Sequence, residues 1–189
     1  MPRDNPSHIL QTLDARLHHR VELTLIGKSA LWLGFDSPPD EYGTTLDVDA
    51  VLSSAESAAM DQDLEFWDAV TRTNDELREL GLYLTHIFEE SQLFLRPDWA
   101  AHRVRIHRPV LQQIVLYRPA TLDLILTKMM RGADAGHMAE IQWMITKDHI
   151  KRDEMIQCLA AARLPAGEAE FERLFRLAES CVLAMEYES

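Results

Sequence analysis

The chain has 189 residues, of which 47% are hydrophobic, and a formal net charge of −12 at pH 7. This length fits one domain, or one domain with a helical extension, and the apolar fraction suffices for an ordinary core. The acidic balance argues against broad nucleic-acid binding through net charge. No apolar run approaches membrane-spanning length, and the N-terminal residues lack the pattern of a signal peptide. Cys158 and Cys181 lack metal-ligand spacing and are expected to be buried thiols of a cytoplasmic protein.

The first elements are expected to be a helix over 6–19 and a strand over 21–26. The helix has a proline and a serine at its start and apolar residues at helical spacing. The strand is rich in β-branched and leucine side chains and ends at Gly27. Lys28 and Ser29 complete a Gly-Lys-Ser corner, and a short apolar helix is expected directly after it.

A second strand is expected over 46–52, after a polar loop rich in proline and acidic residues. Side chains alternate along a strand, so Asp47 and Asp49 are predicted to point to the same face. Two such carboxylates repel each other unless water, a cation or a basic group lies between them. Proteins hold Mg²⁺ with one or two carboxylates together with substrate phosphates. The pair is therefore a candidate metal site, and the alternative is a solvated Asp-x-Asp motif at a strand end.

The order of these motifs resembles the nucleotidyltransferase fold of the polymerase-beta type. Within that superfamily the sequence is most similar to small bacterial nucleotidyltransferase-like proteins of abortive-infection and toxin–antitoxin systems. The resemblance rests on the first strand, the Gly-Lys-Ser corner, the short helix and the Thr-x-Asp-Val-Asp segment. It implies that Asp47 and Asp49 bind catalytic Mg²⁺ or Mn²⁺. It also implies nucleotide contacts from residues around the corner and before the carboxylates, namely Gly27, Lys28, Ser29 and Thr45.

The activity implied by the resemblance is Mg²⁺-dependent transfer of a nucleoside monophosphate from a nucleoside triphosphate. The acceptor would be an RNA, a protein or a small molecule. RNA and a partner protein from the same operon are the further partners that the resemblance implies, and no membrane partner is expected.

The middle of the chain contains its only strongly basic stretch. A helix is expected over 64–80, and strands are expected over 82–88, 102–108 and 111–116. The second of these strands alternates basic and apolar side chains, which places Arg103 and Arg105 on one face. Arginine suits bidentate contact with phosphate oxygens, so both residues are candidates for nucleotide binding. The alternative is an ordinary solvated strand face.

The remaining sequence is helical, with helices expected over 119–131, 137–147, 148–163 and 168–187. In the families that the chain resembles, this region carries a lysine and, later, two acids spaced three apart. Lys128 and Glu140 match the lysine and the second acid, whereas His137 stands in the place of the first acid. The resemblance implies that Lys128 is a catalytic residue that neutralises charge on the phosphates. The alternative is a surface lysine whose stem packs on apolar neighbours.

The predicted fold is therefore α/β, more narrowly α+β, with a small mixed sheet of the nucleotidyltransferase type flanked by helices. The nucleotidyltransferase-like core is expected over 1–118, and a helical region that packs on it is expected over 119–189.

Three departures from the family pattern leave two functions open. A two-metal site normally needs a third carboxylate on a neighbouring strand, and the strands over 102–108 and 111–116 contain no Asp or Glu. Lys28 stands where relatives often carry a second glycine, and His137 replaces an acid. The chain is thus either a nucleotidyltransferase or a lapsed member that acts as a binding or regulatory component. A carboxylate beside the Asp pair, from Glu89 or Glu90, would favour the enzyme.

Overall fold

The computed structural model describes residues 4–167 and 169–187, and the chain divides into two compact units. The sheet unit contains the chain up to Glu89 together with Arg103–Arg118. The helical unit contains Glu90–His102 and the chain from Pro119 onward. The boundary predicted between residues 118 and 119 thus coincides with one junction of the two units. The segment Glu90–His102 differs from the prediction, because it groups with the helices instead of the sheet.

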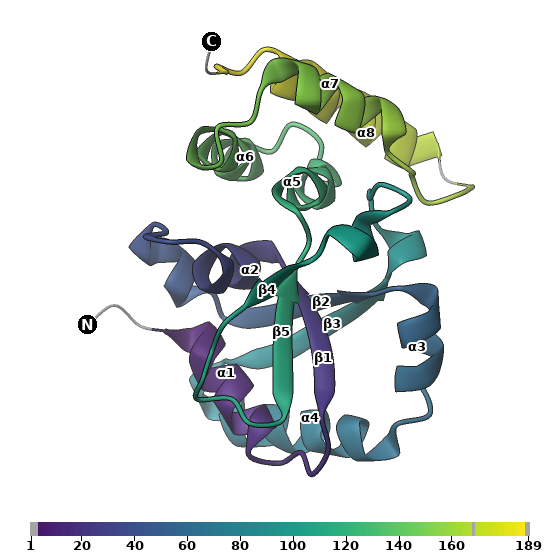
Figure 1. Cartoon of the computed structure of the whole chain (residues 1–189). Coiled ribbons are helices and arrows are strands. Elements are labelled where there is room, and N and C mark those ends of the chain that lie inside the picture. The colour runs from purple at the N-terminus through teal and green to yellow at the C-terminus, as the bar shows by residue number, and fades with distance from the viewer. Residues whose placement is uncertain (1–3, 168, 188–189) are drawn as a thin grey trace. The chain divides into compact units, whose positions relative to one another are not determined.

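A five-stranded mixed sheet forms the centre of the sheet unit, with the strand order β3-β2-β1-β5-β4 (Figure 1). The strands are β1 (Val21–Ile26), β2 (Asp47–Leu52), β3 (Tyr83–Glu89), β4 (Val104–Ile106) and β5 (Ile114–Arg118). The central strand β1 is antiparallel to β2 and parallel to β5. The outer pairs are parallel for β2 with β3 and antiparallel for β4 with β5. The predicted α+β class with a mixed sheet is confirmed.

The two faces of this sheet carry different side chains. One face is apolar, and its fully buried side chains include Leu23, Leu25, Val48 and Ala50. The helices α1 (Asn5–Asp14) and α4 (Leu64–Leu77) contact the sheet and each other. The opposite face carries Asp47 and Asp49, and we call it the carboxylate face. In Figure 1, α3 (Ser54–Met60) lies on the other side of the sheet from α1.

The buried carboxylate of Asp14 accounts for the late start of β5. Its two oxygens accept the backbone N–H groups of Gln112 at 2.9 Å and of Gln113 and Ile114 at 2.8 Å each. Gln112 and Gln113 thus donate their N–H groups to Asp14 and not to a neighbouring strand, whereas Ile114 also donates to Asp14 and is the first residue of the ladder, opposite Val21. The strand therefore begins at Ile114 instead of residue 111 and continues to Arg118. The helix α1 ends at Asp14, five residues before its predicted end.

His19 links the turn before β1 to the start of α4. Its Nε2 lies 2.7 Å from Oδ2 of Asp63, and its Nδ1 lies 3.2 Å from Oε1 of Glu65. The hydrogen bond to Asp63 is the main reason that the pKa of His19 is raised above 6.5. Protonated His19 therefore stabilises the fold fully below that value, and its contribution is lost as the pH rises through the raised pKa.

We accordingly expect His19→Gln to lower the free energy of unfolding at about pH 5.5 and to change it much less at about pH 8.5. Urea denaturation of the variant and the parent chain at both pH values measures this difference. An equal loss at the two pH values would mean that the ring acts through packing and not through its charge.

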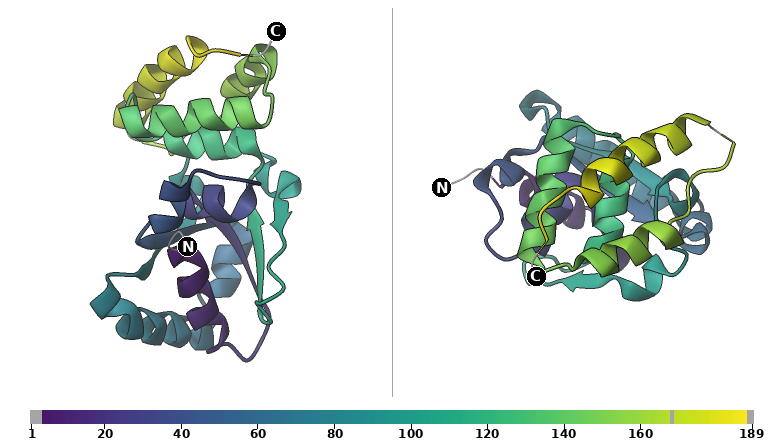
Figure 2. Two further views of the ribbon diagram at one scale, coloured as in Figure 1. Left: turned by 90° about the vertical axis from the view of Figure 1, so that its left-hand side faces the viewer. Right: turned by 90° about the horizontal axis from the view of Figure 1, so that it is seen from above.

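Among its described residues, the helical unit contains four α-helices that follow one another along the chain. They are α5 (Thr121–Met129), α6 (Ala135–Lys147), α7 (Arg152–Ala161) and α8 (Ala169–Leu183). The helices pack against one another, as Figure 2 shows. The predicted start of the last helix, residue 168, lies outside the described residues. Phe94 is buried and meets Phe171 and Phe175 edge to face, with ring centroids 6.0 and 5.5 Å away.

Both cysteines belong to the helical unit, and both are free thiols. Cys158 is buried, and burial raises its pKa to about 12. Cys181 is partly exposed, so the prediction of two buried thiols is correct for Cys158 only. Within the described chain, no helix combines the length and the apolar character needed to cross a membrane.

Candidate functional site

Asp47 and Asp49 lie side by side on the carboxylate face of β2. Both are partly exposed, and they alternate with the fully buried Val48 and Ala50. Asp49 is opposite Ile26 in the antiparallel ladder, so it lies at the end of β1 where the chain turns into the Gly-Lys-Ser corner. The predicted sharing of one face by the two carboxylates is confirmed.

Two threonine hydroxyls hold the carboxylates. Thr45 donates to Oδ1 of Asp47 at 2.8 Å, and Thr85 donates to Oδ1 of Asp49 at 2.7 Å. The Nδ1 atom of His86 lies 3.4 Å from the same Oδ1 of Asp49. In the described chain, Oδ2 of either aspartate accepts no hydrogen bond. Each carboxylate therefore has one oxygen that accepts no hydrogen bond from the described residues.

A β-bulge brings Thr85 and His86 to the same carboxylate. The pairing of β2 with β3 shifts between Val48 and Ala50, so two residues of β3 stand opposite Asp49 alone. Bulges of this kind redirect side chains and are common beside functional sites. Sequence alternation places Thr85 and His86 on opposite faces, and this is why neither was predicted. His86 is 67% exposed and stacks on Phe88 with ring centroids 5.3 Å apart.

The corner after β1 faces Asp49. Gly27 has a φ of +66°, a conformation that favours glycine, and a Cβ atom at this position would lie 3.7 Å from Oδ2 of Asp49. The helix α2 (Gly27–Gly34) starts here, and no described side chain caps its N-terminus. The buried Ser29 hydroxyl donates to the Ile26 carbonyl oxygen at 2.9 Å, so it closes the corner from inside. Lys28 is exposed at the start of the helix.

The two arginines predicted to act together have different surroundings. Arg103 donates to Oε1 of Glu56 at 2.6 Å and to Oγ1 of Thr24 at 3.1 Å, and its guanidinium lies 4.9 Å from the ring centroid of Tyr117. Burial raises the pKa of Glu56, but hydrogen bonds from Ser53 and the charge of Arg103 outweigh burial and lower it overall. Arg103 therefore ties β4 to α3.

Arg105 makes no hydrogen bond or ion pair with the described residues. Its side chain lines a pocket at the hairpin between β4 and β5. The strand β4 contains only Val104–Ile106, shorter than the predicted 102–108. Pro109 lacks a backbone N–H and stands in the loop that follows, which prevents a longer ladder. Arg105 is opposite Tyr117, and the guanidinium of Arg103 lies over the ring of the same Tyr117, so the two arginines lie on one side of the sheet, as alternation predicted.

Lys128 lies in the helical unit and is buried, with its side chain 4% exposed. Its ammonium forms an ion pair with the carboxylate of Glu140, which is 8% exposed. The pKa of the half-buried His137 is lowered, first by burial and then by the charge of Lys128. Lys128 and Glu140, which match the lysine and the second acid of the families that the sequence resembles, thus form a buried ion pair with each other.

The donor set on the carboxylate face consists of carboxylate oxygens, which are the kind of ligand that Mg²⁺ prefers. Two carboxylates, each with one oxygen available, match the protein share of a typical Mg²⁺–phosphate site. Across residues 4–167 and 169–187, no group of three or more His, Cys, Asp or Glu side chains is arranged to hold a metal ion. Glu89 accepts a hydrogen bond from Ser54 at 3.0 Å, and Glu90 accepts one from Trp99 at 2.7 Å. Neither glutamate completes a set of three with the Asp pair in the described chain.

Comparison of the chain with protein-family models, with curated proteins and with solved structures finds no significant match.

Proposed function

We propose that the sheet unit binds a nucleoside triphosphate as its magnesium complex and that nucleotidyl transfer is the reaction of this site. The observation that carries the proposal is the approach of Asp49 to the corner at Gly27, with 3.7 Å between Oδ2 and a Cβ atom at position 27. This approach brings a pair of carboxylates next to the N-terminus of an eight-residue helix.

The two features attract opposite parts of one ligand. A helix N-terminus presents backbone N–H groups and a partial positive charge, and it favours phosphate. Two carboxylates on one strand face favour a cation. A triphosphate with its magnesium ion supplies both charges. The bound ion would neutralise phosphate charge and polarise the phosphoryl group.

The chain's own residues would bind and orient this ligand. Thr45 and Thr85 each fix one carboxylate oxygen and leave Oδ2 directed to the ligand. The backbone at Gly27 and the exposed Lys28 are the phosphate contacts that this geometry favours. The inward hydroxyl of Ser29 positions the corner, so its contribution would come through its backbone N–H.

Weak or acceptor-restricted turnover is the expected behaviour. A second metal is normally bridged by a third carboxylate, and the described residues offer two at this face. The same observation favours the second candidate function, in which the unit binds nucleotide as a regulatory component of the toxin–antitoxin type. The two candidates share nucleotide binding and differ in product formation.

Binding is tested by thermal and calorimetric titration with nucleoside triphosphates and Mg²⁺ or Mn²⁺. A ligand at about 100 times its Kd should stabilise the chain by about 2.7 kcal/mol. The double variant Asp47→Asn/Asp49→Asn should lose the metal-dependent part of this gain and keep the fold. The control Asp36→Asn/Asp61→Asn removes two charges at exposed positions and should keep the gain. An unchanged metal response in Asp47→Asn/Asp49→Asn would remove the pair from the site.

Turnover is tested separately by incubation with radiolabelled triphosphates, total RNA and cell extract, followed by gels for RNA and for protein. Labelling that disappears in Asp49→Ala identifies the enzyme and its acceptor class. Tight binding without labelling favours the regulatory function. Absence of binding, even with Mn²⁺, contradicts both.

A further inference from the structure

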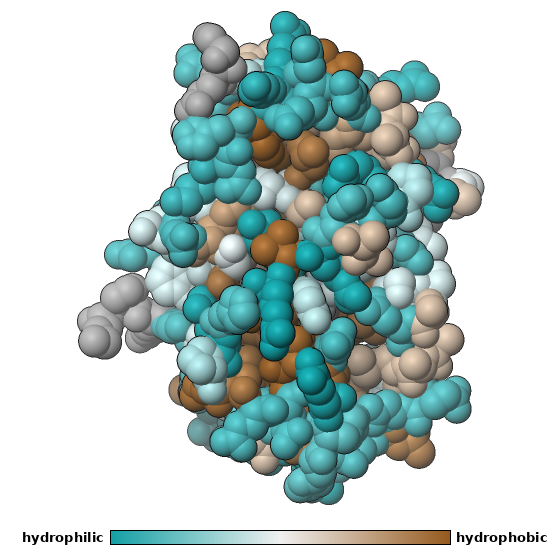
Figure 3. All heavy atoms as spheres, in the orientation of Figure 1, coloured by the Kyte–Doolittle hydropathy of each residue, from teal (hydrophilic) through white to brown (hydrophobic). Residues whose placement is uncertain are grey.

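The hairpin of β4 and β5 encloses a pocket of about 420 Å³ in the sheet unit. Pockets that hold small molecules have volumes of about 300–1,000 Å³. The apolar part of the lining includes Pro109, Leu111, Val115 and Leu116. Over β4 and β5, Figure 3 shows apolar surface between hydrophilic side chains. The basic part of the lining is Arg20, Arg105, His107 and Arg108.

These four basic groups have no acidic partner in the described chain. Arg108 donates to the carbonyl oxygen of Leu33 at 3.0 Å and to that of His107 at 3.5 Å. Arg20, Arg105 and the ring of His107 make no hydrogen bond or ion pair with described residues. Several other arginines of this acidic chain do pair with carboxylates, namely Arg16, Arg72, Arg78, Arg96, Arg103, Arg173 and Arg176.

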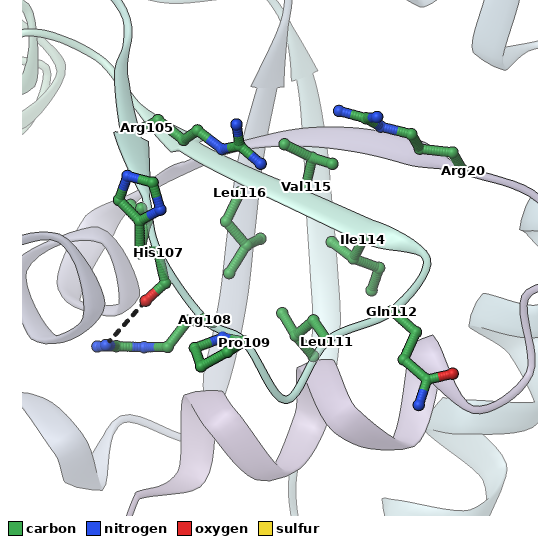
Figure 4. A pocket seen from close by; sticks show the side chains of 11 residues that line it. Arg20, Arg105, His107, Arg108, Pro109, Leu111, Gln112, Ile114, Val115 and Leu116 are labelled. Atoms are coloured by element: carbon green, nitrogen blue, oxygen red, sulfur yellow. Dashed lines mark hydrogen bonds between the residues drawn. The ribbon is translucent and has the colours of Figure 1, made fainter.

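Two of the guanidinium groups converge. In Figure 4, Arg20 and Arg105 extend toward each other on the side of β5 that carries Val115. Like charges that converge are unfavourable unless an anion lies between them. Two acids lie near these groups. Asp14 is 8% exposed and accepts three backbone N–H groups from Gln112 onward. Glu22 is exposed and lies opposite Val115 in the ladder of β1 and β5, and it forms no ion pair with the described arginines. Neither acid forms an ion pair with Arg20 or Arg105, so an anionic ligand between the two guanidinium groups would be favourable.

We propose that this pocket is a second site, which binds a nucleotide through its phosphate. The guanidinium group of an arginine can donate two hydrogen bonds to the oxygens of one phosphate. The planar guanidinium and imidazole groups of the lining are also surfaces on which a base can stack. The apolar lining accepts the base or ribose. The nucleotide is either free or part of an RNA strand, and both sources present the same phosphate and base.

The pocket is separate from the carboxylate pair. Arg20 precedes the first residue of β1, whereas Asp49 is opposite Ile26, the last residue of that strand. The six steps from Arg20 to Ile26 span roughly 20 Å along the strand. Arg105 is level with Thr24, but β4 lies three strand positions from β2, which is roughly 14 Å across the sheet. Binding at the pocket therefore does not depend on the proposed nucleotidyltransferase site, and experiments can support one of the two proposals while they contradict the other.

The test uses the full chain in EDTA, so that a divalent-cation site does not contribute. The probes are adenosine 5′-monophosphate, a hexamer of riboadenylate and inorganic phosphate, measured by calorimetry or fluorescence anisotropy. We expect Arg20→Gln/Arg105→Gln to weaken binding of the nucleotide probes by about tenfold or more, since hydrogen bonds to charged groups are lost. The matched control is Arg72→Gln/Arg78→Gln, which removes the same charge from exposed ion pairs on and just after α4. Its binding should stay within about twofold of the parent, because such pairs lie outside the pocket.

The probes distinguish the source of the nucleotide. Equal affinity for the monophosphate and the hexamer supports a free nucleotide, and a strong preference for the hexamer supports an RNA strand. The proposal is overturned if neither nucleotide binds or if the control variant loses as much affinity as Arg20→Gln/Arg105→Gln. Inorganic phosphate that binds as tightly as the monophosphate would also overturn it, because the apolar lining would then play no part.

Discussion

Lys128→Met is expected to destabilise the helical unit by about 3–5 kcal/mol, because it leaves the carboxylate of Glu140 buried without its cation. Both side chains of this pair are at most 8% exposed. Replacing both partners by apolar residues, as in Lys128→Met/Glu140→Leu, removes the unpaired charge and should recover most of the loss. Chemical denaturation followed by circular dichroism measures both values.

The double variant also decides the role of Lys128. If the lysine neutralises phosphate charge, Lys128→Met/Glu140→Leu should fold and yet lose any nucleotidyl transfer of the parent chain. If it only stabilises the helices, the double variant should keep the parent's binding and labelling. Lys147→Met, at the partly exposed C-terminal end of α6, is the control and should cost about 1 kcal/mol or less. If Lys128→Met also lowers the free energy of unfolding by only about 1 kcal/mol or less, the carboxylate of Glu140 does not depend on Lys128 as a buried ion pair requires.

The second large effect is expected at Arg96, whose replacement by leucine should destabilise the helical unit by about 3–5 kcal/mol. Its Nε and Nη2 donate to Oδ1 and Oδ2 of Asp123 at 3.0 and 2.6 Å, and its backbone N–H donates to Oδ1 at 3.1 Å. Asp123 is fully buried, and the hydrogen bond with it is the main cause of the raised pKa of Arg96. Removing the guanidinium leaves an uncompensated carboxylate in the core.

Two further variants test the geometry of this pair by the same denaturation measurement. Arg96→Lys should fall between the parent and Arg96→Leu, because an ammonium keeps the charge and loses the two-pronged contact. Arg163→Leu is the control, since Arg163 pairs with Leu95 through its backbone and its side chain is exposed. Equal stability of Arg96→Leu and Arg163→Leu would show that the buried pair contributes nothing.

The sequence was sufficient to predict the strands of the candidate site and the common face of its carboxylates. Strand alternation is a local property of the backbone, so β1 and β2 and the side-by-side placement of Asp47 and Asp49 follow from neighbouring residues. The positive φ of Gly27 follows from the same local chemistry, because the chain must turn sharply between a strand and a helix.

Tertiary structure alone decided which side chains reach those carboxylates and which charges are neutralised internally. The bulge that brings Thr85 and His86 to Asp49 is a register shift between two strands, and no local pattern marks it. Partners distant in sequence also fix the surroundings of the two arginines, since Arg103 finds Glu56 47 residues away.

The same distinction explains the remaining differences. Asp14 accepts the backbone N–H groups of residues 98 to 100 positions later, at the start of β5. Lys128 looks like a surface lysine or a phosphate ligand from its own helix, yet it is paired because α6 carries Glu140 to it. Periodicity specifies where a side chain points within its own element. Its charge partner depends on how elements pack, and this information is carried by residues that the local pattern does not contain.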